Sequence, residues 1–258
     1  MNSRPDWKLP AGTSRTSWAH MSDADLAERY DQNLADTALF DCDLQFAKTL
    51  FSSPASLVDL GCGTGRLLIP FAQAGFRVLG VDLSAEMLRV ARAKALSVPL
   101  IQANLVELDC LRDASFDYAA CLFSTLGMIS GVEHRQAVLA HAYRILKPGG
   151  RFLLHVHNRW FHLHTRAGRR WLIADGWRRM RGSPNSGDFE MPAHHGIGGL
   201  ALHHFSRGEI VRELTLAGFR QIRVEPVSLC PDCRLPLPWL VPGLRAYGFL
   251  LSCVRSKM

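Results

Sequence analysis

The distribution of apolar and polar positions along the 258 residues predicts an α/β protein. Short apolar runs that end at Gly, Pro or an acid predict strands, whereas apolar residues spaced three and four apart predict helices. Strands are predicted at 56–60, 76–81, 99–102, 116–122, 151–156, 219–227 and 246–254. Helices are predicted within 22–50, at 65–74, after Ser84, at 132–146 and at 207–217. Strands and helices that alternate in this way form a sheet with helices on both faces.

The chain is predicted to form one domain behind a short arm. Residues 1–21 are polar and rich in Ser and Thr, and we expect a flexible N-terminal arm. Residues 22–258 have the length of one α/β domain with insertions. Ser22 with Asp25 three residues later predicts the first helix start. No regular alternation is found across most of 157–205, which is therefore predicted to be an insertion after the fifth strand.

A glycine loop carries the strongest chemical signal. Gly61, Gly63 and Gly65 follow the first strand and lead directly into a helical pattern. Glycine allows a close backbone approach to a ligand, and a helix start offers free N–H groups. The spacing G-x-G-x-G differs from the G-x-G-x-x-G of dinucleotide-binding loops, which argues against a nicotinamide-dependent oxidoreductase. Asp82, at the end of the neighbouring strand, can accept both hydroxyls of a ribose, so a nucleoside ligand is predicted.

The stretch VDLGCGTGRLLIPFAQAGFRVLGVDLSAEML resembles the class I S-adenosylmethionine-dependent methyltransferases, a Rossmann-like superfamily. FDYAACL at 116–122 and LKPGG at 146–150 are similar to further motifs of that family. The resemblance implies a doubly wound, mostly parallel sheet of seven strands, with the last strand antiparallel between the fifth and sixth. It also implies a cap over the cofactor pocket, and we assign the insertion 157–205 to a lid in this cap.

The resemblance implies S-adenosyl-L-methionine as cofactor and S-adenosyl-L-homocysteine as product. An acid usually stands where this chain has Asn104, whose amide carbonyl can still accept a hydrogen bond. The residues that match the family's cofactor contacts are Tyr30, Asp59, Gly61, Cys62, Gly63, Gly65, Asp82, Leu83, Met87, Asn104, Leu105, Cys121 and Leu122.

Methyl transfer from a sulfonium is an in-line displacement, in which the protein mainly positions the acceptor. A general base is needed only if the acceptor carries a proton at its working pH. His157, at the carboxyl end of the fifth strand, is the candidate catalytic residue, although a strand-end histidine is also often purely structural. Phe123, Ser124 and Arg159 are the candidate substrate contacts, because ligands bind beyond the carboxyl ends of the strands.

An arginine-rich segment dominates the chain's charge. Residues 159–181 hold seven arginines and one acid, a local net charge of +6 against +7 for the whole chain. Tryptophans lie between these arginines. Arginine and tryptophan together can bind an anionic small molecule, an anionic lipid surface or RNA. The first interpretation is a methyltransferase of a small-molecule, anionic acceptor. The alternatives are an RNA methyltransferase, a non-catalytic cofactor- and nucleic-acid-binding protein, and a solvated lid.

The cysteines and the apolar stretches set further expectations. Seven scattered cysteines do not form a disulfide framework, which predicts a reduced, cytoplasmic protein. Cys230 and Cys233, together with histidines such as His194 and His195, could indicate zinc. A second close ligand pair is missing, so no metal site is predicted. No signal peptide and no run of ~18 uncharged apolar residues is found, so no transmembrane segment is expected.

Overall fold

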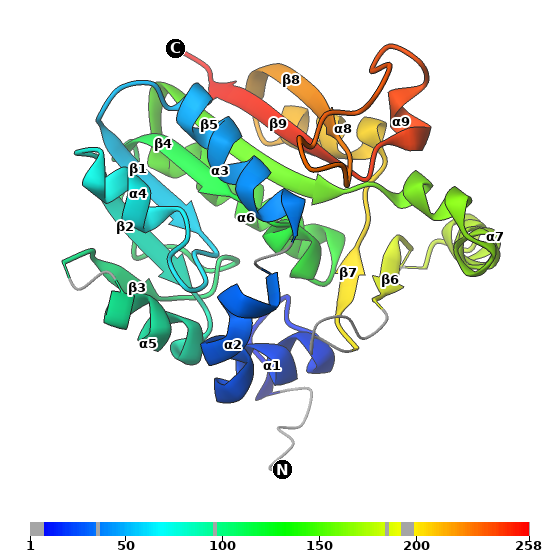
Figure 1. The fold of residues 1–258 in the computed structure, drawn as a ribbon, viewed down its shortest axis with the longest axis horizontal. Coiled ribbons are helices and arrows are strands. Elements are labelled where there is room, and N and C mark those ends of the chain that lie inside the picture. The colour runs from blue at the N-terminus through cyan, green and yellow to red at the C-terminus, as the bar shows by residue number, and fades with distance from the viewer. Residues whose placement is uncertain (1–7, 35–36, 95–96, 184–185, 192–198, 258) are drawn as a thin grey trace.

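The computed structural model of the chain describes residues 8–34, 37–94, 97–183, 186–191 and 199–257 (Figure 1). Its centre is a seven-stranded sheet with the strand order β3-β2-β1-β4-β5-β9-β8. These strands are β1 (Ser56–Leu60), β2 (Arg77–Asp82), β3 (Leu100–Gln102), β4 (Phe116–Cys121), β5 (Leu146–His157), β8 (Phe219–Val227) and β9 (Gly248–Arg255). β9 runs antiparallel to β5 and β8, and the other pairs are parallel. The predicted fold class is confirmed.

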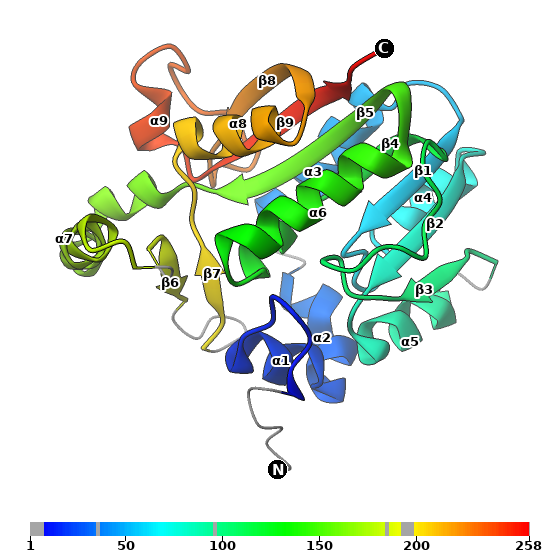
Figure 2. The ribbon, with the colours of Figure 1, turned by 180° about the vertical axis from the view of Figure 1, so that it is seen from behind.

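Helices cover both faces of the sheet, because its central strands are buried on both sides. The helices are α1 (Arg15–Met21), α2 (Ala24–Leu34), α3 (Ala38–Leu50), α4 (Leu68–Gln73), α5 (Ala85–Lys94), α6 (Val132–Ile145), α7 (Arg166–Met180), α8 (Arg207–Leu216) and α9 (Pro242–Arg245). α3 and α4 lie over the face in front in Figure 1, and α6 and α8 lie over the face in front in Figure 2. Each face has its own core, one around Phe51 and Leu68 and the other around Leu139 and Leu214.

The N-terminal region differs from the sequence-based prediction. Ser22 is not a helix start but follows the last residue of α1. The carboxylate of Asp23 instead accepts a hydrogen bond of 3.0 Å from the backbone N–H of Leu26, in the first turn of α2. α1 itself falls inside the predicted arm 1–21, of which residues 1–7 lie outside the described residues. α1 contacts α5, and its residues His20 and Met21 line the same hollow as Gly61 and Gly63 of the glycine loop.

The insertion after β5 contains the 3₁₀ helix η3 (Arg159–His164), the 15-residue α7 and the two-stranded ribbon of β6 (Asp188–Glu190) and β7 (Ala201–His203). The sequence pattern did not predict α7, because its apolar residues do not gather on the side that faces the protein. Residues 184–185 and 192–198, with His194 and His195, lie outside the described residues. The role of this segment as a lid stays a prediction.

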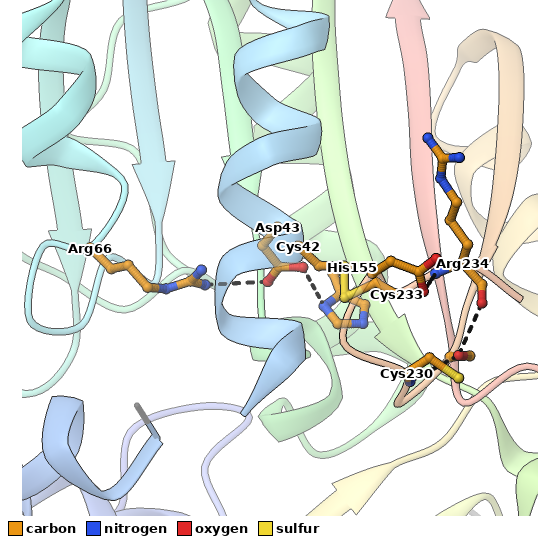
Figure 3. The surroundings of a disulfide bond; sticks show 9 residues. Cys42, Asp43, Arg66, His155, Cys230, Cys233 and Arg234 are labelled. Atoms are coloured by element: carbon orange, nitrogen blue, oxygen red, sulfur yellow. Dashed lines mark hydrogen bonds and ion pairs between the residues drawn. A yellow bond between two sulfur atoms is a disulfide. The ribbon is translucent and has the colours of Figure 1, made fainter. Parts of the chain in front are cut away.

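A disulfide joins α3 to the loop that follows β8 (Figure 3). It links Cys42 to Cys233, which are 191 positions apart in the sequence. The expectation that all seven cysteines are reduced is therefore wrong for this pair. Cys230, the other half of the C-x-x-C motif, is exposed and has a free thiol. Cysteine spacing could not predict this pairing, because only the folded sheet brings α3 close to the loop that follows β8.

Candidate active site

The glycine loop between β1 and α4 has the backbone that its composition predicts. Gly61, Gly63 and Gly65 have φ angles of +83°, +52° and +86°, where other residues are strained. A Cβ on Gly61 would lie 2.3 Å from the Thr125 side chain, so packing alone requires glycine there. A Cβ on Gly63 would meet no atom within 4 Å. Gly63 therefore borders open space, into which a ligand can approach its backbone.

Asp82, the last residue of β2, holds the glycine loop in place. Its Oδ2 accepts a hydrogen bond of 2.8 Å from Gly63 N–H, and its Oδ1 accepts one of 2.8 Å from Ser84 N–H. Burial raises the pKa of this carboxyl, although the backbone donors of Ser84 and Gly63 oppose the rise. A carboxylate oxygen can accept more than one hydrogen bond, so Asp82 keeps the capacity to bind two hydroxyl groups.

Two adjoining hollows of about 680 and 510 Å³, partly open to solvent, lie in front of the loop. They share Tyr30, Gly61, Gly63, Thr125 and Met128. The other predicted cofactor residues of the first hollow are Asp82, Leu83, Met87, Asn104 and Leu105. Those of the second hollow are Asp59, Cys62 and Leu122.

Two predicted residues, Gly65 and Cys121, line neither hollow. A Cβ on Gly65 would touch Ala91 of α5 at 3.4 Å, so this glycine faces a helix rather than a ligand. The Cys121 side chain is fully buried in the apolar core around Leu139. Both residues lie next to the site without reaching it in this conformation.

The two hollows differ in charge. The first combines the Asp82 carboxylate with apolar walls such as Met87 and Leu105, which suits a ribose and a flat heterocycle. The second contains Asp59 and Arg66, which suit a group that carries both an ammonium and a carboxylate. Burial raises the pKa of Asp59 to about 7, against the opposing effect of Arg66. An ammonium group bound there would restore the ionised form of Asp59.

Comparison with known proteins agrees with this geometry. Residues 57–150 match a family model described as a methyltransferase domain. A ubiquinone biosynthesis O-methyltransferase of Idiomarina loihiensis is 36% identical over 107 residues, which are 40% of this chain and 42% of that protein. A demethylmenaquinone methyltransferase of Streptomyces avermitilis is 32% identical over 134 residues, which are 50% of this chain and 56% of that protein.

The fold has solved relatives over almost its whole length. The structure of a 1,6-didemethyltoxoflavin-N1-methyltransferase from Burkholderia thailandensis, with its substrate and S-adenosylhomocysteine bound, has a TM-score of 0.59. The two chains are 19% identical, and the alignment covers 98% of this chain and 93% of the Burkholderia protein. The family match over residues 57–150 and the shared fold both support a class I S-adenosylmethionine-dependent methyltransferase.

The family's cofactor is the one that the sequence predicted, and the two hollows fit it. The ribose and adenine groups of S-adenosylmethionine match the first hollow, and its amino-acid end matches the second. This chain spans about half the length of the curated relatives it matches. Within the described residues, no helix is both long and apolar enough to cross a bilayer. In the same ranges, no three His, Cys, Asp or Glu side chains converge as a metal site.

Asn104, the departure from the family pattern, is engaged within the protein. Its side-chain amide donates a hydrogen bond of 3.0 Å to the carbonyl of Ala11. Its Oδ1 accepts one of 3.1 Å from the N–H of Val106. Asn104 thus ties the segment before α1 to the rim of the first hollow, and one lone pair of Oδ1 remains for an adenine amino group.

His157 is buried, whereas a general base that contacts an incoming acceptor is expected at an accessible surface of the site. Its ring is buried against the rings of His204 and Tyr247, with centroids 5.3 and 5.0 Å away. Burial lowers its pKa to about 3, so the ring is neutral and weakly basic at neutral pH. The backbone N–H of His157 donates to Ser124 Oγ at 3.4 Å. The role of His157 as a base stays a prediction, against which this low pKa weighs.

The three predicted substrate contacts occupy different places. Phe123 lines the second hollow, and its ring lies 5.7 Å from the guanidinium carbon of Arg66. Ser124 is fully buried behind it, in the left-handed conformation with φ of +61°. Arg159 is buried and forms an ion pair with Asp175 of α7. The structure therefore brings only Phe123 to the edge of the cofactor hollows.

Asp43 of α3 is a site residue that sequence reasoning missed (Figure 3). Its fully buried carboxylate accepts hydrogen bonds from Arg66 (3.3 Å) and from the backbone N–H of Phe123 (3.0 Å). Its Oδ1 also lies 2.9 Å from Nδ1 of His155. Burial alone would raise the pKa of Asp43, but His155 and Arg66 hold it below its ordinary value. No motif marks this residue, because its partners come from three distant segments.

Other missed residues come from the N-terminal segment. Thr13, His20 and Met21 line the first hollow, although the sequence assigned them to an arm. The carbonyl of Met21 accepts a hydrogen bond of 2.5 Å from Ser84 Oγ, next to Asp82. Polar composition predicted flexibility here, and only the packed structure shows that this segment closes one side of the hollow.

Proposed function

We propose that this protein transfers a methyl group from S-adenosylmethionine to a small-molecule acceptor by in-line displacement. The observation that carries the proposal is the pair of adjoining hollows in front of the glycine loop, one with Asp82 and the other with Asp59 and Arg66. The cofactor supplies a sulfonium-bound methyl group that is already electrophilic. The chain's own residues therefore need only bind, orient and exclude water.

Each residue has a distinct task in this proposal. Asp82 accepts the ribose hydroxyls, and its bond to Gly63 N–H keeps the loop in register with them. Asp59 binds the ammonium group, and Arg66 binds the carboxylate of the same amino-acid end. Asp43 holds Arg66 and the backbone of Phe123 at the opening toward the acceptor. Tyr30, whose pKa burial raises to about 12, stays a neutral phenol on the shared wall.

The acceptor is proposed to be a small organic molecule. Relatives named for ubiquinone biosynthesis and demethylmenaquinone support a ring compound, and Phe123 offers a face on which such a ring can stack. The sequence-based alternatives, an RNA acceptor or a non-catalytic binding protein, predict a different labelled fraction. A labelled-methyl transfer assay on fractionated cell extract tests them together, and we expect label among small molecules or lipids. Label in RNA, or in no fraction, contradicts the proposal.

Calorimetric titration of S-adenosylmethionine tests the donor site. Asp82→Ala removes two charge-assisted hydrogen bonds to the ribose, each worth roughly 1.5–3 kcal/mol, so affinity should fall at least a hundredfold. Gly63→Val should also abolish binding, because its side chain enters open space that the ligand needs. The matched control is Asp113→Ala, an exposed carboxylate paired with Arg144 away from the site. Unchanged affinity in Asp82→Ala, with folding verified by circular dichroism, contradicts the assignment.

A further inference from the structure

The outward face of α7 is apolar at its centre. Ile173, Trp177 and Met180 are 65%, 57% and 72% exposed, which is unusual for side chains of this size. Their spacing of four and three residues places them on one side of the helix. α7 stands out from the body at one end of the molecule (Figures 1 and 2). This face therefore meets solvent or a partner rather than the rest of the domain.

Arginines surround these apolar residues on the same face. Arg166, Arg169, Arg170 and Arg181 are exposed and lie within about a quarter-turn of the apolar line by helical spacing. Within the described part of the chain, none of the four forms an ion pair with a carboxylate. The one acid of α7, Asp175, points inward and is fully buried. No described carboxylate therefore balances the positive charge of the outward face.

The inward side of α7 is firmly attached, so its orientation is determined. Asp175 pairs with Arg159 of η3 and accepts a hydrogen bond of 2.7 Å from Gly187 N–H. The indole N–H of Trp171 donates to the carbonyl of Asp188 at 3.1 Å. These bonds connect the helix to η3 and β6. Turning the apolar face inward would break a buried ion pair, which costs roughly 3–5 kcal/mol.

A second exposed apolar group lies at the same end of the molecule, around α9 (Figures 1 and 2). Trp239 is 76% exposed, and Leu240, Val241 and Leu244 are also exposed. Trp160 of η3 lines one shallow hollow with Val241 and Leu244, so η3 connects the two groups.

We propose that this end of the molecule docks on an anionic lipid surface through α7. Its arginines fit lipid phosphates, its tryptophan fits the headgroup level, and Ile173 and Met180 fit the acyl boundary. Residues 159–181 carry +6 of the chain's net charge of +7, so the attraction to such a surface is concentrated at this end. An RNA strand fits less well, because the two most exposed apolar side chains of α7, Ile173 and Met180, gain nothing from phosphates or stacked bases.

Vesicle flotation of the full chain tests the proposal. The wild type should float with vesicles of phosphatidylcholine mixed with phosphatidylglycerol, and roughly tenfold less with phosphatidylcholine alone. Arg169→Gln with Arg170→Gln should lower the anionic partition coefficient roughly thirtyfold, because two charges near the surface are lost. Ile173→Ser with Trp177→Ser should lower it at least tenfold, through the lost apolar contact.

Matched controls separate this face from general charge and general hydrophobicity. Arg77→Gln with Arg92→Gln removes two exposed charges from β2 and α5. Leu216→Ser removes a 70% exposed leucine from the last position of α8. Both controls should float like the wild type. All variants should keep wild-type affinity for S-adenosylmethionine, which verifies folding.

Three results would overturn the proposal. The first is equal loss of flotation in the controls and the α7 variants. The second is no flotation of wild type, with binding of total RNA that the α7 variants lose. The third is no flotation with a wild-type dimer in light scattering that Trp177→Ser converts to a monomer, because the face would then be a contact between copies of this chain.

Discussion

Replacing Asp59 with asparagine should stabilise the ligand-free protein at alkaline pH while weakening its binding of the methyl donor. Asp59 lies at the end of β1, where it is 3% exposed. Burial raises its pKa to about 7, with Asp82 and Asp43 adding to the rise and Arg66 opposing it. Asparagine has the same shape and no charge to bury, so the folded state no longer has to hold an ionised carboxylate.

The size of the effect follows from linkage. The folded-state pKa of Asp59 is raised from 3.8 to about 7. Its contribution to the free energy of unfolding is therefore fully present below pH 3.8 and is lost as the pH rises through 7. Each unit of difference is worth about 1.4 kcal/mol, so ionising Asp59 costs the folded protein about 4 kcal/mol at pH 8. At pH 5 the cost is about 2 kcal/mol by the same relation. The gain in Asp59→Asn should therefore roughly double between these two conditions.

Urea denaturation of both proteins from pH 5 to pH 8, without cofactor, measures this gain. Asp113→Asn is the matched control, because Asp113 is 68% exposed and should show no gain that grows with pH. Calorimetry at pH 8 should show at least tenfold weaker binding of S-adenosylmethionine to Asp59→Asn, since its ammonium loses a buried anionic partner. A gain that is flat with pH, or a loss of stability at pH 8, would refute the reasoning.

Two further changes test the support around the site. Asp43→Ala removes the buried carboxylate that binds Arg66 and Phe123, and we expect a loss of roughly 3–5 kcal/mol in urea denaturation. Because the pKa of Asp43 is lowered, this loss of stability should be present at neutral pH and shrink as the pH falls below about 4. A loss under ~1 kcal/mol, or a loss that grows in acid, contradicts this account. Cys42→Ser opens a crosslink over 191 positions, and loop entropy predicts a loss of about 5 kcal/mol that added reductant reproduces in the wild type. Identical urea midpoints with and without reductant would show that the crosslink does not form in solution.

The glycine loop and Asp82 could be predicted from the sequence because local interactions determine both. The loop requires positive φ angles at Gly61, Gly63 and Gly65. Asp82 reaches the loop because it is the last residue of the neighbouring strand. Both requirements act over a few residues, so they appear as a motif. The apolar runs predicted the seven strands, and the family resemblance implied their arrangement; the observed order confirms the predicted fold class.

Residues that depend on distant partners could not be predicted in this way. Asp43 has no motif, yet α3 carries it to Arg66 and Phe123. His157 has the sequence position of a catalytic base, a role that stays a prediction, and only the fold shows that burial lowers its pKa to about 3. Arg159 has the position of a substrate contact, but it is buried against Asp175.

The insertion shows the same division. Sequence alone determined that 159–181 is strongly basic and rich in tryptophan, because charge and composition need no coordinates. Only the tertiary structure decided which side of α7 faces outward, since that depends on the buried bonds of Asp175 and Trp171. Composition fixes what a surface can bind, and packing decides which side chains form that surface.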